Sequence, residues 1–120
     1  MTTATKFDFA AYRRALERID AKGLSEAFAE DCEWTQVDSR TPPASPMVLR
    51  GREAITQLGE HVASLGLDIR VFDEVIGESR VAYSTECTYP DGKRVLSTAT
   101  LEIDGDGRVA RLREVQAFDA

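Results

Sequence analysis

The sequence has few of the residues from which metal and redox sites are built. Its 120 residues include two cysteines and one histidine. Cys32 and Cys87 lie far apart without metal-ligand spacing, so we expect reduced, buried thiols rather than a disulfide, as is typical of a cytoplasmic protein. A nucleophile elbow and a glycine-rich phosphate loop are also missing from the sequence. We therefore expect neither a metal nor a cofactor.

Clustered positive charge and long hydrophobic runs are lacking as well. The 15 Lys and Arg residues are scattered among 21 Asp and Glu residues, for a formal net charge of -6. Because nucleic acids and anionic membranes attract clustered basic groups, neither is an expected partner. No apolar run approaches the ~20 residues that cross a bilayer. Residues 1–6 carry no secretory signal, and we expect a frayed tail there.

What is present is the pattern of one α+β domain over residues 1–120. Hydrophobic residues make up 42% of the chain and charged residues 30%, which is typical of a globular domain. Apolar residues at helical spacing or in alternation predict the secondary structure. Helices are predicted at 7–22, 24–30 and 52–65, and strands at 32–38, 67–76, 80–89, 93–103 and 108–118. We expect the helices to cover one face of a strongly bent, mostly antiparallel sheet and to enclose a cone-shaped cavity.

A stiff loop is predicted at 39–46, because prolines at 42, 43 and 46 prevent regular strand pairing. Its length suits a lid over a pocket, and it equally suits a long connection without such a role.

Three motifs in this order resemble the nuclear transport factor 2-like superfamily, also called the SnoaL-like or ketosteroid-isomerase-like fold. They are FAEDCEW at 28–34, LRGREAI at 49–55 and DGDGRV at 104–109. The resemblance covers essentially the whole chain and implies the fold. That superfamily contains isomerases, dehydratases, epoxide hydrolases, polyketide cyclases and non-catalytic binding proteins, so the resemblance does not imply one activity.

The known catalytic sets of that superfamily do not fit this chain. The position of the ketosteroid isomerase base falls at about Gln36, and that of the protonated aspartic acid at about Ala99. Neither residue can do that work, although Tyr12 lies on the helix that supplies the family's tyrosine. A site resembling that of scytalone dehydratase would need a histidine pair, and the chain has a single histidine.

Two glutamates near the C-terminus are the leading candidates for proton transfer. A two-residue turn at 91–92 and a four-residue turn at 104–107 would place Glu86, Ser97 and Glu114 in one row of the sheet. Carboxyl groups on an apolar concave face lose hydration, which raises their pKa toward values useful in acid/base catalysis. The alternative is that both glutamates pair with arginines or face water, because a one-residue slip reverses every side chain.

The other candidates would line the same cavity. Asp38 is a further candidate proton carrier, and Tyr12, Gln36 and Gln116 are candidate hydrogen-bond donors to a substrate. The remaining predicted lining residues are Trp34, His61, Ser97 and Leu112. Core packing is the competing interpretation for Trp34 and Tyr12, and a structural or exposed position is the competing interpretation for His61.

Three hypotheses follow for the function. The first is a cofactor-free isomerase, cyclase, dehydratase or epoxide hydrolase acting on a small apolar molecule. The second is a ligand-binding protein without a competent acid/base pair, and the third is an interaction module with a filled pocket. The opposite sheet face, which we expect to carry Tyr83, Thr85, Leu96 and Val115, is apolar enough to predict a homodimer, as the resemblance also implies.

Overall fold

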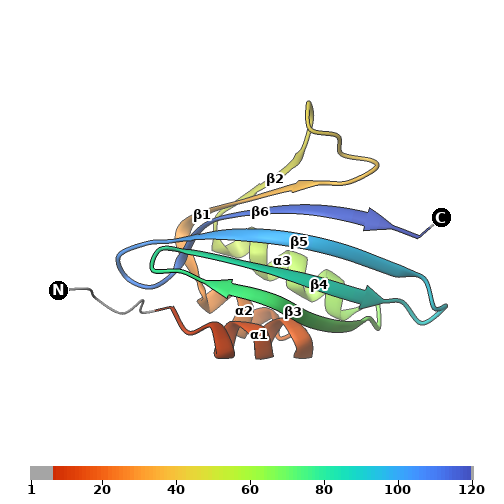
Figure 1. The fold of residues 1–120 in the computed structure, drawn as a ribbon, viewed down its shortest axis with the longest axis horizontal. Helices are drawn as coiled ribbons and strands as arrows, with labels where there is room; N and C mark the ends of the chain where they lie inside the picture. The colour runs from red at the N-terminus through yellow and green to blue at the C-terminus, as the bar shows by residue number, and fades with distance from the viewer. Residues whose placement is uncertain (1–6, 120) are drawn as a thin grey trace.

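The computed structural model describes residues 7–119, and in this range three helices cover one face of a six-stranded mixed sheet (Figure 1). The expected tail at 1–6 lies outside the described residues. The α+β prediction is confirmed. The helices are α1 (Phe9–Arg18), α2 (Ala21–Glu26) and α3 (Arg52–Ala63), and the strands are β1 (Phe28–Val37), β2 (Met47–Arg50), β3 (Asp68–Ile76), β4 (Arg80–Thr88), β5 (Arg94–Ile103) and β6 (Val109–Phe118).

The strands follow the order β2-β1-β6-β5-β4-β3, with β1 and β6 parallel and every other pair antiparallel. The sheet does not close into a barrel, because β2 and β3 are its edges. Strand β2 was not predicted from the sequence. It is four residues long and directly follows the proline loop. A strand this short has too few residues for an alternation of apolar and polar side chains to reveal it, and its pairing with β1 is what identifies it.

The first two helices meet at Ile19 and Asp20, earlier than the predicted end at Lys22. Ile19 has a left-handed backbone with φ 53°, and Asp20 Oδ1 accepts a hydrogen bond of 3.1 Å from the N–H of Gly23. Asp20 is therefore the N-cap of α2, and Gly23 lies inside that helix. The prediction placed α2 too late, and β1 begins at Phe28 because its first residue already pairs with Val109.

The turn between β4 and β5 differs from the predicted two-residue turn. The N–H of Gly92 donates to the carbonyl of Tyr89 at 2.9 Å, and Gly92 has φ 89°. This is a three-residue hairpin loop that ends in a left-handed glycine. Glu86 consequently pairs with Leu96 and not with Ser97. The one-residue difference places Glu86 on the outer face of the sheet.

The turn between β5 and β6 also differs, but by an even number of residues. The N–H of Asp104 donates to the carbonyl of Arg108 at 2.8 Å, and a bulge follows within the β5–β6 pairing. Ser97 therefore pairs with Gln116 instead of Glu114. Because side chains alternate with a period of two, Glu114 keeps the inner face that the sequence predicted for it.

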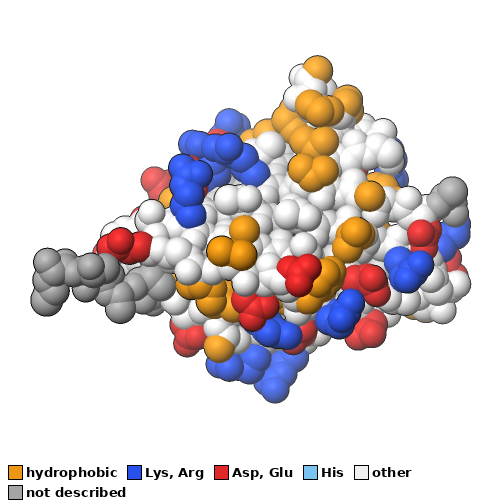
Figure 2. All heavy atoms as spheres, viewed as in Figure 1, with side chains coloured by type: hydrophobic (Ala, Val, Ile, Leu, Met, Phe, Trp, Pro, Cys, Tyr) orange, Lys and Arg blue, Asp and Glu red, His pale blue; other side chains and the backbone are white. Residues whose placement is uncertain are grey.

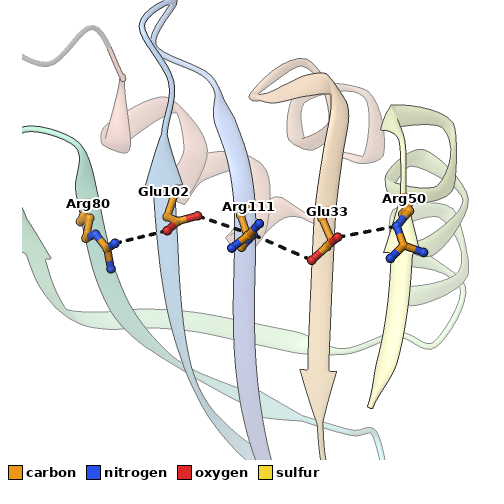
Figure 3. Close-up of polar contacts among 5 residues, drawn as sticks. All are labelled: Glu33, Arg50, Arg80, Glu102 and Arg111. Carbon is orange, nitrogen blue, oxygen red and sulfur yellow. Dashed lines mark hydrogen bonds and ion pairs between the residues drawn. The ribbon is translucent and has the colours of Figure 1, made fainter. Parts of the chain in front are cut away.

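A ladder of alternating charges crosses the outer face of five strands (Figure 3). Glu102 pairs with Arg80 on β4 and Arg111 on β6, while Glu33 pairs with Arg111 and with Arg50 on β2. The N···O distances run from 3.3 to 3.8 Å, and these residues are direct neighbours in the strand register. Exposed ion pairs stabilise by only about 0–1 kcal/mol each. The ladder therefore adds little stability, but it favours this strand register, because a slipped register would no longer place opposite charges side by side.

The core lies between the sheet and the helices. Its fully buried members include Tyr12 of α1, Ile55 of α3, and Leu101 and Leu112 of the central strands. Helices α2 and α3 cross closely at Gly59, where an added Cβ would lie 3.0 Å from the Cα of Ala21. This packing holds the helical layer against one part of the sheet and leaves a hollow beside it.

Candidate acid/base site

A cavity of about 260 Å³ lies between the helices and the inner face of the sheet. The helical wall is mostly apolar and includes Ala15, Leu16, Leu58, Val62 and Leu65. The sheet wall carries most of the polar groups, which include Gln36, Asp38, Tyr83, Thr85, Glu114 and Gln116. Small-molecule sites commonly combine an apolar lining with a few convergent polar groups in this way.

Glu114 is the buried carboxyl group of this cavity. It is 8% exposed, and none of the ion pairs described within residues 7–119 includes it. Burial raises the pKa of Glu114 from 4.5 to about 7, and hydrogen bonds with the side chains of Gln116 and Ser97 act in the opposite direction. A carboxyl group with this pKa exchanges protons readily near neutral pH.

A chain of hydrogen bonds connects Glu114 to β1. The amide nitrogen of Gln116 donates to Glu114 Oε1 at 2.5 Å, and the amide nitrogen of Gln36 donates to Gln116 Oε1 at 3.1 Å. Trp34 Nε1 donates to Gln36 Oε1 at 3.4 Å. The parallel β1–β6 pairing, in which Gln36 lies opposite Glu114, brings these side chains together from the two ends of the chain.

Asp38 is the last residue in this chain of hydrogen bonds, but its carboxylate already accepts hydrogen bonds from the backbone of a turn. Asp38 Oδ1 accepts hydrogen bonds from the backbone N–H groups of Arg40 at 2.8 Å and Thr41 at 2.9 Å, and Oδ2 accepts from Gln36 Nε2 at 3.3 Å. Burial is the largest single influence and acts to raise the pKa of Asp38, but the hydrogen bonds together outweigh it and lower the pKa. Asp38 is therefore a carboxylate at neutral pH and can accept but not supply a proton.

Tyr83 brings a buried phenol to the cavity wall, and the sequence analysis missed it. It lines the cavity from β4, and its hydroxyl lies 2.5 Å from the hydroxyl of Tyr12. Tyr12 is 1% exposed and lies behind Tyr83, outside the lining. Burial raises the pKa of both phenols, so both are neutral at physiological pH. A three-residue loop with glycine in its last position was the signal that would have placed Tyr83 inside.

Glu86 lies away from the cavity, contrary to the prediction. It is opposite Arg70 on β3 and Leu96 on β5, on the outer face of the sheet. The proposed row of Glu86, Ser97 and Glu114 is therefore wrong, because the first hairpin loop is one residue longer than assumed. On the outer face, Glu86 cannot exchange a proton with a molecule in the cavity.

The remaining predicted residues divide between the lining and the core. Trp34 and His61 line the cavity, although His61 is exposed at its α3 side. Ser97 lies beside Glu114 and is hydrogen-bonded to Thr85. Leu112 is fully buried in the core and does not belong to the lining.

The proline loop reaches the cavity through one residue. Of residues 39–46, Arg40 belongs to the lining, and its guanidinium lies 5.6 Å from the ring centre of Phe118. The lid role predicted for this loop stays a prediction.

Residues 7–119 contain no cluster of His, Cys, Asp and Glu that could hold a metal ion. Within the same residues, no helix is long and apolar enough to cross a membrane.

Comparison with solved structures establishes the fold. A protein of unknown function from Mesorhizobium loti, described as nuclear transport factor 2-like, superposes with a TM-score of 0.73 at 20% identity, over 93% of this chain and 88% of that one. The epoxide hydrolase/cyclase-like enzyme SalBIII, which has a role in pyran ring formation in the polyether salinomycin, superposes with a TM-score of 0.70 at 18% identity, over 90% and 86%. This chain has the nuclear transport factor 2-like fold. The resemblance inferred from the three motifs is confirmed for the fold.

The nuclear transport factor 2-like fold alone does not assign an activity to the chain. A protein of cystatin-like fold from Silicibacter pomeroyi is equally similar in structure, with a TM-score of 0.73 at 14% identity over 90% of this chain and 72% of that one. No protein-family model matches the chain. No curated protein matches it either. Function must therefore be inferred from the cavity.

Proposed function

We propose that this chain is a cofactor-free enzyme that transfers protons to and from a small apolar molecule, with Glu114 as the proton carrier. The observation that carries the proposal is the position of Glu114, a buried carboxyl group in an otherwise mainly apolar cavity, with a pKa raised by burial to about 7. Such a group is present in both protonation states near neutral pH, which is the requirement for a general acid or base.

The neighbouring groups suit this role for Glu114. Gln116 donates to the carboxylate and stabilises it once a proton has left. When Tyr12 donates to Tyr83, the proton of Tyr83 is available to an oxygen atom of a bound molecule. The chemistry that fits is proton abstraction next to a carbonyl group, or proton donation to an epoxide or a leaving hydroxyl group. These steps underlie isomerisation, cyclisation, dehydration and epoxide opening.

The cavity volume limits the substrate to a small molecule. Sites for drug-sized ligands usually measure about 300–1,000 Å³, and this cavity is smaller at about 260 Å³. One or two rings with a single carbonyl, hydroxyl or epoxide oxygen are the chemical class that fits.

The test is proton exchange catalysed at a carbon atom next to a carbonyl group. Cyclohexanone, cyclohexenone and indanone would be incubated with the protein in D₂O, and deuterium incorporation followed by proton NMR. Styrene oxide and cyclohexene oxide would be tested in parallel for ring opening. We expect catalysis of at least one of these reactions, its loss in Glu114→Gln, and its retention in Glu86→Gln, which changes the same side chain on the outer face.

One observation favours a second candidate, a ligand-binding protein. The other two carboxyl groups among the described lining residues, Asp38 and Asp20, both accept hydrogen bonds from backbone N–H groups, so neither is set up to share proton transfer with Glu114. Tight binding of the same ketones, measured by quenching of Trp34 fluorescence, without any reaction that depends on Glu114 would support this candidate over the enzyme.

We also propose a homodimer formed through the outer face of the sheet. Figure 2 shows hydrophobic side chains exposed on this face between charged ones. Leu96 on β5 is 51% exposed and Val115 on β6 is 61% exposed, which is unusual for large apolar residues in the centre of a sheet. A second copy covering these residues would remove them from water.

A further inference from the structure

The amide group of Gln116 can face Glu114 in two ways with opposite effects. Its nitrogen donates hydrogen bonds and therefore stabilises a carboxylate, whereas its oxygen accepts them and therefore favours the protonated acid. In the structure the nitrogen faces Glu114, at 2.5 Å from Oε1. The residues around Gln116 show what holds it in this orientation.

The two ends of the hydrogen-bond chain can each act in one sense only. The indole N–H of Trp34 is a donor and cannot accept, and the ionised carboxylate of Asp38 is an acceptor and cannot donate. Between them, Gln36 presents its oxygen to Trp34 at 3.4 Å and its nitrogen to Asp38 at 3.3 Å. Turning the Gln36 amide over would set two donors against each other at Trp34 and two acceptors against each other at Asp38.

The fixed orientation of Gln36 determines the orientation of Gln116. The nitrogen of Gln36 also donates to Gln116 Oε1 at 3.1 Å, which leaves the Gln116 nitrogen facing Glu114. A reversed Gln116 would bring two amide nitrogens together at Gln36 and two oxygens together at Glu114. Both contacts are repulsive when the carboxyl group is ionised.

We propose that Gln36 is a positioning residue, which acts through Gln116 to keep a hydrogen-bond donor directed at the Glu114 carboxylate. This role rests on the proposed function of Glu114 as proton carrier. Its consequence is that Trp34 and Asp38, which do not contact Glu114 in the chain of hydrogen bonds, influence how readily Glu114 gives up its proton.

The other ionisable groups near Glu114 come from several elements. Tyr12 of α1 and Tyr83 and Cys87 of β4 each interact with Glu114, and burial, the largest influence, raises the pKa of all three, to about 11 for Cys87. These groups are neutral at pH 7. The remaining ionisable residues of the lining are Asp20, Asp38, Arg40, His61 and Tyr89.

The experiment measures the titration of Glu114 directly, without a substrate. Protein labelled with ¹³C at the glutamate carboxyl carbon would be titrated from pH 4 to pH 9 by NMR, with Glu114→Gln identifying the resonance. The variants are Gln36→Met, Gln116→Met and the double variant, because methionine keeps the length of the side chain and cannot replace the amide. Gln57→Met, on the exposed face of α3, is the control.

We expect Gln36→Met to raise the Glu114 pKa by about half a unit to one unit, since the Gln116 amide then adopts both orientations. Gln116→Met should raise it at least as much. In the Gln116→Met background, Gln36→Met should cause no further rise, and Gln57→Met should cause none in any background. Trp34→Phe removes the indole donor and should raise the pKa in the same direction by a smaller amount.

Two results would overturn the proposal. One is an unchanged Glu114 pKa in Gln36→Met, and the other is an equal shift by Gln36→Met with and without Gln116. The wild-type titration separates this proposal from the proposed function. A wild-type pKa near 4.5 would remove the basis for Glu114 as a proton carrier, while the difference between variants would still report on Gln36.

Discussion

The hydroxyl groups of Tyr12 and Tyr83 form a hydrogen bond of 2.5 Å inside the core, although 71 positions separate them in the chain. The bond joins α1 to β4, and both side chains are almost fully buried, at 1% and 2% exposure. Tyr83 also lines the cavity. The pair therefore connects the packing of the first helix to the wall of the candidate site.

Removing both of these hydroxyl groups should destabilise the fold by less than the sum of the two single removals. Tyr83→Phe leaves the hydroxyl of Tyr12 buried without its partner, and we expect a loss of about 1–2 kcal/mol in the free energy of unfolding. The double variant Tyr12→Phe, Tyr83→Phe should lose less than the sum of the two single losses. Urea denaturation of the four proteins measures this. Strictly additive losses would show that the hydroxyl groups do not interact.

The stability of the protein should carry a pH dependence that comes from Glu114. Its pKa is raised to about 7 in the folded state, against 4.5 as its ordinary value, mainly by burial. The folded state therefore holds the proton more tightly than the unfolded state does. The resulting stabilisation is fully present below about pH 4.5 and is lost as the pH rises through about 7, with a total of about 3 kcal/mol.

Comparison with Glu114→Gln isolates this contribution, because glutamine stays neutral at every pH. The two proteins should have similar stability at pH 4.5, and the variant should be more stable by about 3 kcal/mol at pH 8. Urea denaturation at a series of pH values measures the difference. Glu86→Gln is the control and should show no comparable gain at pH 8. A constant difference between wild type and Glu114→Gln would contradict the raised pKa.

The hairpin loop that sets the β4–β5 register should depend on a single glycine. Gly92 has φ 89°, where a Cβ is strained, so Gly92→Ala should cost about 1–2 kcal/mol of unfolding free energy. Gly105, in the next hairpin loop, has open space around its Cβ position and no positive φ. Gly105→Ala should change stability by less than about 0.5 kcal/mol. Equal effects would indicate that the strained turn does not contribute to this register.

The proposed dimer predicts that a charge on the outer face changes the mass of the particle. We expect sedimentation equilibrium of the wild type at micromolar concentration to give twice the chain mass. Val115→Glu places a carboxylate in the centre of the proposed interface and should give the mass of one chain. Gln57→Glu adds the same charge on α3 and should stay dimeric. A wild-type particle with the mass of one chain would disprove the dimer.

The α+β class and most of the strands could be predicted from local patterns. The alternation along β4, β5 and β6 and the apolar stripe of α3 repeat with the periods of their elements, and burial enforces those periods. Boundaries were less predictable. The first helix was predicted to run to Lys22, but Asp20 accepts a hydrogen bond from the N–H of Gly23 and so begins α2.

The candidate site was predicted in part, and the two errors on β4 have one cause. Glu114 and Gln116 line the cavity as expected, because shifting the β5–β6 register by two residues preserves the face. Gln36 and Trp34 share one face of β1 and also line it. Glu86 and the missed Tyr83 changed faces together, because the β4–β5 register differs by one residue.

The sequence by itself therefore determined which residues alternate together on each strand, since the two-residue period is a property of the local backbone. Only the tertiary structure decided which of the two faces on β4 turns inward, because that choice depends on the length of one hairpin loop. It also decided that Gln36 and Gln116 meet. They lie on strands from opposite ends of the chain, and the parallel pairing of β1 with β6 is a long-range contact that no local pattern records.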